Sequence, residues 1–267
     1  MIKNIILLLF LSLLATNVCA KGGHKISRPV TDQLSIDDDD DGKDRIVLNF
    51  EQDSYIFNLT EYANPMITYS SNDWDIGIAT QNILEYEQYV TTSAQNFQND
   101  TYFNLSKTFE YEDLYGLSDE WSDRLDFLST TFGSQIGTVF PMSTSASPGH
   151  LDNSTIHQYY FIDTDAEIIE DKVSVHYGPY YSNAALTTTT SYIGWQVGLQ
   201  AVMIPKKLKL DMTEYSGHSN VSGAVFTLTW TVNRNFELFV GGAVAAHNSG
   251  NYNYAISGLN LIKIFDK

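Results

Sequence analysis

Apolar and polar residues alternate along four successive segments within residues 191–246, and each segment ends in a turn signal. In the first segment the odd positions are apolar and the even ones are small or polar: Ile193, Trp195, Val197, Leu199, Ala201 and Met203 against Gly194, Gln196, Gly198 and Gln200. A period of two residues places alternate side chains on opposite faces of a β-strand. The segments therefore predict strands with one apolar and one polar face.

Two predicted turns set the pairing of these strands. A two-residue turn at Pro205-Lys206 would place Met203, Ala201 and Leu199 opposite Leu208, Leu210 and Met212. A three-residue turn at residues 233–235 would place Val232, Trp230 and Leu228 opposite Phe236, Leu238 and Val240, with Thr231 facing Glu237 and Thr229 facing Phe239. Because a slip of one residue would move every side chain to the other face, this agreement of turn length and pattern favours antiparallel pairing.

Earlier parts of the chain show the same alternation. Residues 73–83 carry Trp74, Ile76 and Ile78 on one face and Asp75, Gly77 and Ala79 on the other, and residues 102–109 carry Phe103, Leu105 and Phe109 against Asn104, Ser106 and Thr108. Further strands are expected at 126–140, 155–168, 172–183 and 254–265. Residues 45–72 are either a small hairpin or the first pair of strands. The count is therefore about ten strands, with twelve as the alternative.

One apolar face fits either a soluble sandwich of two sheets or a closed barrel in a membrane. Residues 1–20 have the pattern of a secretory signal, with Lys3 before an apolar stretch and a small-residue cleavage site at Val18-Cys19-Ala20. Cys19 is the only cysteine, so the mature chain would have neither a disulfide nor a thiol site. No later run approaches the roughly 18 apolar residues of a membrane helix, so a mature chain that spans a bilayer must do so as a barrel.

Composition favours the membrane alternative. The chain has 17 tyrosines, 14 phenylalanines and 4 tryptophans, and aromatic residues gather at the two interfaces of membrane barrels. The formal net charge of −17 argues against a nucleic-acid partner, because phosphates require a basic surface.

An acidic tract precedes the first expected strand. Residues 21–44 have few large apolar side chains and include five consecutive aspartates, so we expect a flexible, disordered periplasmic arm. Asp37, Asp39 and Asp41, followed by Gly42, have the spacing that opens a calcium loop. Leu48 stands where that loop needs a bidentate glutamate. A solvated tract is the preferred interpretation, and a weak calcium site is the alternative.

The lengths of the connections predict an orientation. Membrane barrels have short periplasmic turns and longer outer loops. If the first strand rises from the periplasm, the short connections at 169–171, 205–206 and 233–235 fall inside, and longer ones at 85–99, 141–154, 184–190, 216–222 and 247–253 fall outside. Both termini would then be periplasmic. The connection at 110–125 is the exception, because it should be short and is not.

Over residues 73–265 the chain resembles the bacterial outer-membrane β-barrel class. Proteins of that class usually end their last strand in an aromatic residue that the insertion machinery reads, and Phe265 is similar to that residue, although Asp266 and Lys267 follow it. The resemblance implies an all-β, antiparallel, up-and-down transmembrane barrel over 73–267. It also implies a place in the outer membrane of a Gram-negative cell, with lipid and the insertion machinery as partners.

The polar face would line the lumen. Its expected members are mostly small or uncharged: Gln196, Gln200, Lys209, Asp211, Thr213, Thr227, Thr229, Thr231 and Glu237. A barrel of about ten such strands could leave a narrow polar pore. Lys209, Asp211 and Glu237 would either form salt bridges inside the barrel or select ions. The sequence thus predicts a small porin-like channel for ions or small polar solutes, and the alternative is a non-conducting barrel that presents outer loops for binding or a structural role.

A lipid hydrolase is a further alternative. Outer-membrane lipid hydrolases use a histidine and a serine two positions apart on one face, so that the base activates the nucleophile. His247 and Ser249 have this spacing without the asparagine that follows the serine in the motif, and His218-Ser219-Asn220 lacks the spacer. Both stretches are expected in loops, where these residue types are common. We therefore expect no enzyme activity, no cofactor and no metal, and the sequence does not assign an oligomeric state.

Overall fold

The computed structural model describes residues 44–55, 60–71, 73–81, 83–87, 96–111, 127–143, 156–182, 193–217, 223–245 and 253–265. Every regular element in these ranges is a strand, as the alternation predicts. The strands are β1 (Asp44–Tyr55), β2 (Thr60–Ser71), β3 (Trp74–Gln81), β4 (Ile83–Glu87), β5 (Asn96–Glu110), β6 (Leu128–Ser143), β7 (Ile156–Ile169), β8 (Val173–Ser182), β9 (Ile193–Ile204), β10 (Leu208–Tyr215), β11 (Gly223–Asn233), β12 (Phe236–Ala245) and β13 (Tyr254–Phe265). The described part of the chain holds no helix that is long and apolar enough to cross a membrane.

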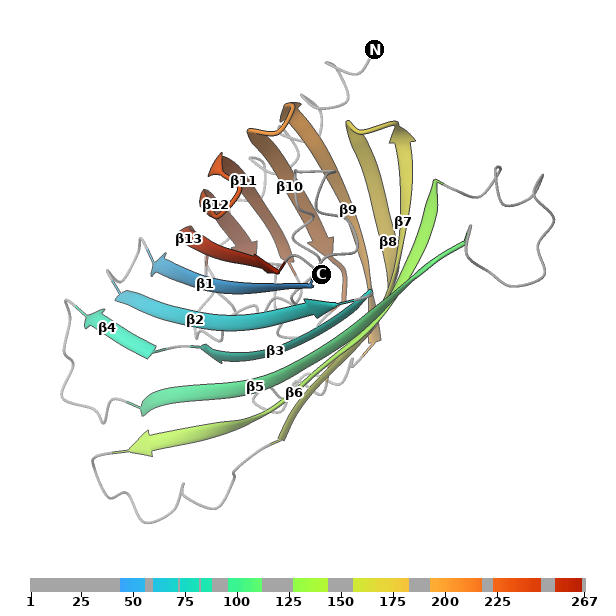
Figure 1. Cartoon of the computed structure of the whole chain (residues 1–267). Coiled ribbons are helices and arrows are strands. Elements are labelled where there is room, and N and C mark those ends of the chain that lie inside the picture. Colours follow the sequence, from blue (N-terminus) through green and yellow to red (C-terminus); the bar gives the residue numbers. More distant parts are fainter. Residues whose placement is uncertain are drawn as a thin grey trace.

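The strands form one closed antiparallel sheet (Figure 1). Closure follows because β1 pairs with β13 on one side and with β2 on the other. β3 and β4 both pair with β2, each along a different half of it, so the thirteen strands occupy twelve positions in the barrel wall. The twelve-strand alternative is therefore confirmed, and the count of about ten was low because it left out β1 and β2.

The N-terminal region forms two long strands. β1 runs without interruption from Asp44 to Tyr55, and β2 follows as its antiparallel partner. Of the two alternatives for residues 45–72, the first pair of barrel strands is the one observed. The expected signal at 1–20 and the acidic arm up to residue 43 lie outside the described residues.

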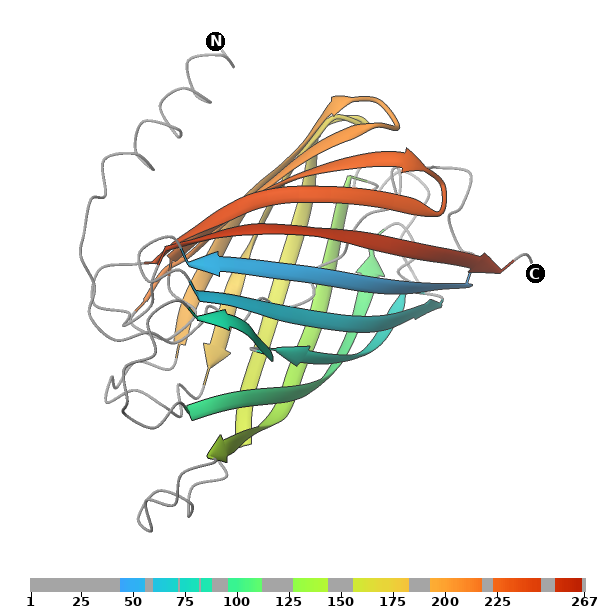
Figure 2. The same cartoon turned by 90° about the vertical axis from the view of Figure 1, so that its left-hand side faces the viewer.

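The two ends of the barrel differ in their connections. At one end, which we call the turn end, short turns join β2 to β3, β7 to β8, β9 to β10 and β11 to β12. Asp44, the first residue of β1, pairs with Phe265, the last residue of β13, at this same end, and Figure 2 shows the end of β13 beside the turn between β11 and β12. The opposite end, where β13 begins, we call the loop end. Residues 112–126, which complete the long connection from β5 to β6 at the turn end, lie outside the described residues.

The tight turns fall within one residue of their expected positions. They occupy residues 170–172, 205–207 and 234–235. Three non-glycine residues at the turn end have positive φ: Asp73 at 64°, Asp171 at 56° and Lys206 at 57°. Aspartate tolerates this left-handed conformation better than most residues, whereas lysine has no such preference.

The expected pairing of β9 to β12 holds except beside the turns. Ala201 faces Leu210 and Leu199 faces Met212, and Trp230 faces Leu238 and Leu228 faces Val240. The pairs nearest each turn were wrong: Ile204, not Met203, faces Leu208, and Asn233, not Val232, faces Phe236. In each hairpin the register shifts by one residue at this point, as in a β-bulge, so the alternation of faces is preserved along the rest of both strands.

The outer face of the barrel is apolar. Large side chains that alternate with buried ones remain exposed around the whole wall: Phe50 and Ile67 on β1 and β2, Ile76 and Ile78 on β3, Phe103 on β5, Phe132 on β6, Ile162 on β7, Tyr177 on β8, Ile193, Trp195 and Val197 on β9, Trp230 on β11, Val240 on β12 and Leu261 on β13. On β13, whose pattern is apolar on both sides, the odd-numbered residues face outward, including Phe265 and Lys263.

The inner face is polar at many positions but is not lined by small residues alone. A cluster of buried aromatic and aliphatic side chains occupies the interior near the loop end: Tyr159, Phe161, Tyr180, Tyr215, Val225, Phe239, Ala243, Tyr254 and Ile256. Tyr62 on β2 packs against this cluster. On the strands β7 to β13 the interior therefore carries large aromatic rings as well as small and uncharged residues.

Candidate functional site in the barrel interior

His176 is the centre of a polar cluster on the inner face of β7 to β10. Its Nδ1 lies 2.9 Å from Oδ2 of Asp163 on β7, and its Nε2 lies 3.1 Å from Oγ1 of Thr213 on β10. Because an ionised carboxylate can only accept a hydrogen bond, Nδ1–H donates to Asp163. The imidazole crosses β9 at Gly198, where a Cβ atom would come within 1.7 Å of Nε2. Glycine at position 198 therefore leaves room for the imidazole of His176, which reaches from β8 to contact residues on both β7 and β10.

Lys209, Asp211 and Gln200 form a second group nearer the turn end. The ammonium of Lys209 lies 3.4 Å from Oδ2 of Asp211, and the amide of Gln200 donates to the same oxygen at 3.2 Å. Lys209 is almost completely buried, with 5% of its surface exposed. A buried ammonium requires a compensating partner, and Asp211 is that partner for Lys209.

Glu237 is held by neutral donors. Its Oε2 accepts a hydrogen bond from Asn260 on β13 at 3.0 Å, and its Oε1 accepts one from Thr231 at 3.1 Å. Asn260 in turn accepts a hydrogen bond from the amide of Asn49 on β1 at 2.9 Å. This chain of side chains crosses the seam between the first and last strands. It ties the closure of the barrel to the charge of one buried glutamate.

The remaining expected lumen residues also lie on the inner face. Gln196 is completely buried and accepts a hydrogen bond from the hydroxyl of Tyr159 at 3.1 Å. Thr227 pairs with Asp211 and Thr229 pairs with Lys209 in the register of β10 and β11, and residues paired in this way share a face. All nine residues proposed from the sequence are therefore brought to one surface of the barrel wall.

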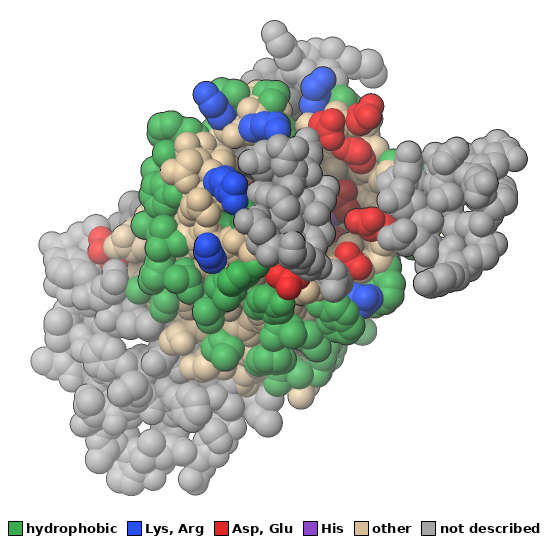
Figure 3. Space-filling model, in the orientation of Figure 1, with side chains coloured by type: hydrophobic (Ala, Val, Ile, Leu, Met, Phe, Trp, Pro, Cys, Tyr) green, Lys and Arg blue, Asp and Glu red, His purple; other side chains and the backbone are tan. Residues whose placement is uncertain are grey.

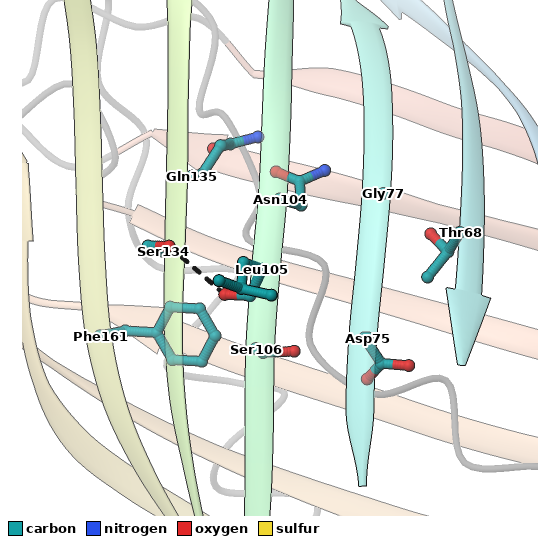
Figure 4. A pocket seen from close by; sticks show the side chains of 9 residues that line it. All are labelled: Thr68, Asp75, Gly77, Asn104, Leu105, Ser106, Ser134, Gln135 and Phe161. Carbon is teal, nitrogen blue, oxygen red and sulfur yellow. Dashed lines mark hydrogen bonds between the residues drawn. The ribbon is translucent and has the colours of Figure 1, made fainter. Parts of the chain in front are cut away.

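A third polar group lies on the opposite wall, around a small pocket formed by β2, β3, β5, β6 and β7 (Figure 4). The residues that line it are Thr68, Asp75, Gly77, Asn104, Leu105, Ser106, Ser134, Gln135 and Phe161. The pocket has room for about one water molecule. Four of its buried side-chain atoms have no hydrogen-bond partner: Thr68 Oγ1, Asn104 Oδ1, Gln135 Oε1 and Gln135 Nε2.

Charged side chains surround the turn end in two groups (Figure 3). Acidic side chains gather mainly beside β7 and β8, where Glu167, Glu170 and Asp171 are exposed. Basic side chains gather mainly along β9 to β13, and the exposed ones include Lys206, Lys207, Arg234 and Lys263. The charge at this end of the barrel is therefore distributed unevenly between the two sides (Figure 3).

Several residues proposed from the sequence cannot be placed in this arrangement. Asp37, Asp39 and Asp41 of the possible calcium loop, His247 and Ser249 of the possible hydrolase motif, and residues 218–220 lie outside the described residues. Within the described ranges, no group of three or more His, Cys, Asp or Glu side chains could hold a metal ion.

The sequence analysis did not single out Asp163, Gln135 or the partners of His176. Asp163 has an odd number, as Tyr159 and Phe161 have, and odd-numbered residues of β7 share one face. Assigning faces along residues 155–168 could therefore have placed Asp163 inward. Gln135 lies two residues from Gly133 and from Gly137 in β6, so all three share one face of the strand. The polar faces expected for residues 73–83 and 102–109 are confirmed, since Gly77, Asn104 and Ser106 are buried. Ile78 and Phe103, on the opposite faces, are exposed.

The chain was compared with protein families, curated proteins and solved structures. No protein-family model matches the chain, and no curated protein matches it. Among solved structures, the chain is similar to outer membrane phospholipase A from Escherichia coli, with 11% identity, a TM-score of 0.45, and coverage of 84% of this chain and 90% of that chain. It is also similar to the outer membrane protein Omp33 of Acinetobacter baumannii, with 7% identity, a TM-score of 0.41, and coverage of 84% of this chain and 99% of that chain.

Proposed function

We propose that the chain is an outer-membrane barrel that acts as a small porin-like channel for ions or small polar solutes. The first support is the apolar outer wall. Ile193, Trp195 and Val197 alone expose 69%, 55% and 53% of their surfaces, and apolar residues of this kind continue around the barrel. A contiguous apolar surface of this extent needs an apolar surrounding, which lipid provides.

The main support for a channel is a polar strip along the inner wall from β2 to β6. Asp75 and Ser106 are paired at the level nearer the turn end, and Thr68, Asn104 and Gln135 lie together at the next level inward. Several polar atoms of these residues have no protein partner. Buried polar groups are normally hydrogen-bonded, and those without a protein partner are satisfied by water. These groups beside the aromatic cluster support a hydrated route for polar solutes along this part of the wall.

The two ends of the barrel support an orientation. Short turns face the periplasm in membrane barrels, so we place the turn end, with both Asp44 and Phe265, on the periplasmic side. Lys107 fits this placement because it faces outward near the turn end, with its ammonium 4.9 Å from the centre of the Trp74 ring. A lysine above an aromatic ring suits the boundary between lipid and water.

The channel is tested by cysteine scanning in planar bilayers. Since Cys19 is the only cysteine, a Cys19→Ala background has none. Ser106 and Phe103 lie on β5 with opposite facing, because Ser106 is buried and Phe103 is 48% exposed. The refolded barrel is expected to give discrete current steps, and a charged, water-soluble thiol reagent should reduce the current of Ser106→Cys but leave that of Phe103→Cys unchanged. A folded, inserted barrel without steps, or current unaffected by modification at both positions, would contradict the proposal.

One observation favours a second candidate, a non-conducting barrel that presents its loops. The aromatic cluster reaches from β7 to β13 and touches Tyr62 on β2, which narrows the interior near the loop end. If these rings close the route, the refolded barrel will be stable to heat on a gel and yet silent in the bilayer. Recovery of current on replacing Tyr159 or Tyr180 by alanine would then identify the rings as the obstruction.

A further inference from the structure

We propose that the pocket at Gln135 is a binding site for a small hard cation of the Na⁺ or K⁺ class. The proposal deepens the proposed channel function and rests on it for the route by which the ion arrives. Gln135 on β6 is 99% buried, and neither its oxygen nor its nitrogen has a hydrogen-bond partner. An orphaned buried amide costs free energy, and a bound ligand would offset that cost.

The free atoms of the pocket are mainly oxygens. The amide nitrogen of Asn104 contacts the sulfur of Met66 at 3.9 Å, which leaves Oδ1 of Asn104 turned away from that contact and without a partner. Oε1 of Gln135 and Oγ1 of Thr68 are the other free oxygens. Amide carbonyl and hydroxyl oxygens are ligands of hard cations, and rings of carbonyl oxygens can replace the hydration shell of a monovalent ion. Mg²⁺ gives up its water reluctantly and so suits a pocket of this size less well.

The surrounding charge favours a cation. Asp75 contributes a carboxylate to the pocket wall, where it accepts a hydrogen bond from Ser70. The side chains of Glu51 and Asp53 on β1 and of Asp163 on β7 also face inward. In an interior of low dielectric these carboxylates attract cations more strongly than they would in water.

Gly77 leaves space beside Oγ1 of Thr68. A Cβ atom at this position would lie 3.0 Å from that oxygen, so it would crowd one of the proposed ligands. The Asn104 atom on this side is Nδ2, at 3.7 Å, so Oδ1 of Asn104 lies on the side of Gln135 (Figure 4). The register places Gly77 between Thr68 on β2 and Asn104 on β5. Thr68, Gly77, Asn104 and Gln135 thus come from four consecutive positions of the wall and line one small pocket.

The site is tested at equilibrium by heat-dependent gel mobility of the full chain refolded in detergent. Melting midpoints are compared in NaCl, KCl and N-methylglucamine chloride at one ionic strength, because the organic cation is too large for the pocket. A ligand that binds the folded state raises the midpoint. We expect the midpoint of the wild-type protein to be a few degrees higher in NaCl or KCl, and Gln135→Leu and Gly77→Ala to abolish that difference. Gln196→Leu, which alters an equally buried glutamine on β9, should retain it.

The Gln135→Leu variant separates a bound ion from an empty pocket. If nothing binds, removing two orphaned polar atoms stabilises the protein in all three salts, and the proposal is overturned. If a cation binds, the variant is more stable than the wild type in N-methylglucamine chloride and loses that advantage in KCl. Should Gln135→Leu fail to fold, Gln135→Glu is expected to bind the cation at a lower concentration, and an unchanged midpoint curve would overturn the proposal equally.

The outcomes for the site and for the channel are distinguishable. A salt-dependent midpoint without current in a bilayer would retain the cation site and remove the channel. Current with a midpoint that is the same in all three salts would retain the channel and remove the site.

Discussion

Asp163 and His176 lie on the neighbouring strands β7 and β8 and meet on the inner face of the barrel, with 2.9 Å between Oδ2 and Nδ1. Their contact continues to Thr213 on β10, 3.1 Å from Nε2. One side chain therefore links three strands of the wall through hydrogen bonds that do not belong to the backbone ladder. These bonds have direct consequences for stability.

Replacing Asp163 by alanine should destabilise the barrel. The variant leaves Nδ1–H of His176 buried without an acceptor, which costs about 1–3 kcal/mol in the free energy of unfolding. Asp163→Asn keeps an acceptor oxygen and should cost less. Urea unfolding in lipid vesicles, followed by tryptophan fluorescence, measures both. Equal losses for alanine and asparagine would mean that the hydrogen bond to His176 contributes nothing.

Gly198→Ala should destabilise the barrel because the added Cβ atom would clash with the imidazole of His176. The added Cβ would come within 1.7 Å of Nε2, and such overpacking typically costs about 1–3 kcal/mol. The double variant Gly198→Ala with His176→Ala removes the clash, so the two changes should be strongly non-additive. Additive losses of unfolding free energy would contradict the placement of the imidazole over Gly198.

The seam between β1 and β13 should depend on Glu237. In Glu237→Leu, the buried amide of Asn260 loses its hydrogen bond to Oε2 of Glu237, at a cost of about 1–3 kcal/mol. Glu237→Gln retains one acceptor oxygen and is expected to fall between this variant and the wild type. Glu214→Gln is the control, because Glu214 is exposed, and it should change the unfolding free energy little. Heat-dependent gel mobility that orders the variants differently would argue against the hydrogen-bonded chain from Thr231 to Asn49.

The turn at Lys206 should accept glycine with a gain in stability. Lysine at a φ of 57° carries the steric cost of the left-handed region, about 1–2 kcal/mol, which glycine avoids at some cost in chain entropy. Lys206→Gly is therefore expected to stabilise the barrel by roughly 0.5–1 kcal/mol. The neighbouring Lys207→Gly, at a residue without positive φ, should have no such benefit. Unfolding curves of the two variants that coincide would contradict this account of the turn.

The sequence predicted the strands of the barrel wall well, because the alternation of apolar and polar residues shows directly which side chains face outward and which face inward. Trp195 and Gln196 are adjacent in sequence, and the first is 55% exposed while the second is completely buried. Turn residues such as Pro205 fixed the register to within one position. β1 was harder to recognise as one strand, because the alternation of its apolar residues stops at Gln52-Asp53, where Asp53 faces the interior.

The interior was less predictable, because partners across it come from distant strands. Nothing local indicates that Tyr159 stacks on Tyr180 with ring centres 5.6 Å apart, or that Asn260 joins Glu237 to Asn49. The position of Tyr159 in the alternating pattern shows that its side chain faces inward. Only the closed barrel shows how far its ring extends across the interior. For the same reason the pocket at Gln135 follows from an amide without a partner, a property that a sequence pattern does not carry.

The proposal that the chain spans a bilayer is tested most directly by fluorescence quenching of its outward tryptophans. Trp195 and Trp230 are 55% and 53% exposed on the outer wall. In variants that keep only one of these tryptophans, refolded into vesicles, lipids brominated on the acyl chain should quench the emission strongly and aqueous iodide should quench it little. Strong quenching by iodide and none by brominated lipid would show that the apolar wall faces water, and the membrane barrel with its channel would have to be abandoned.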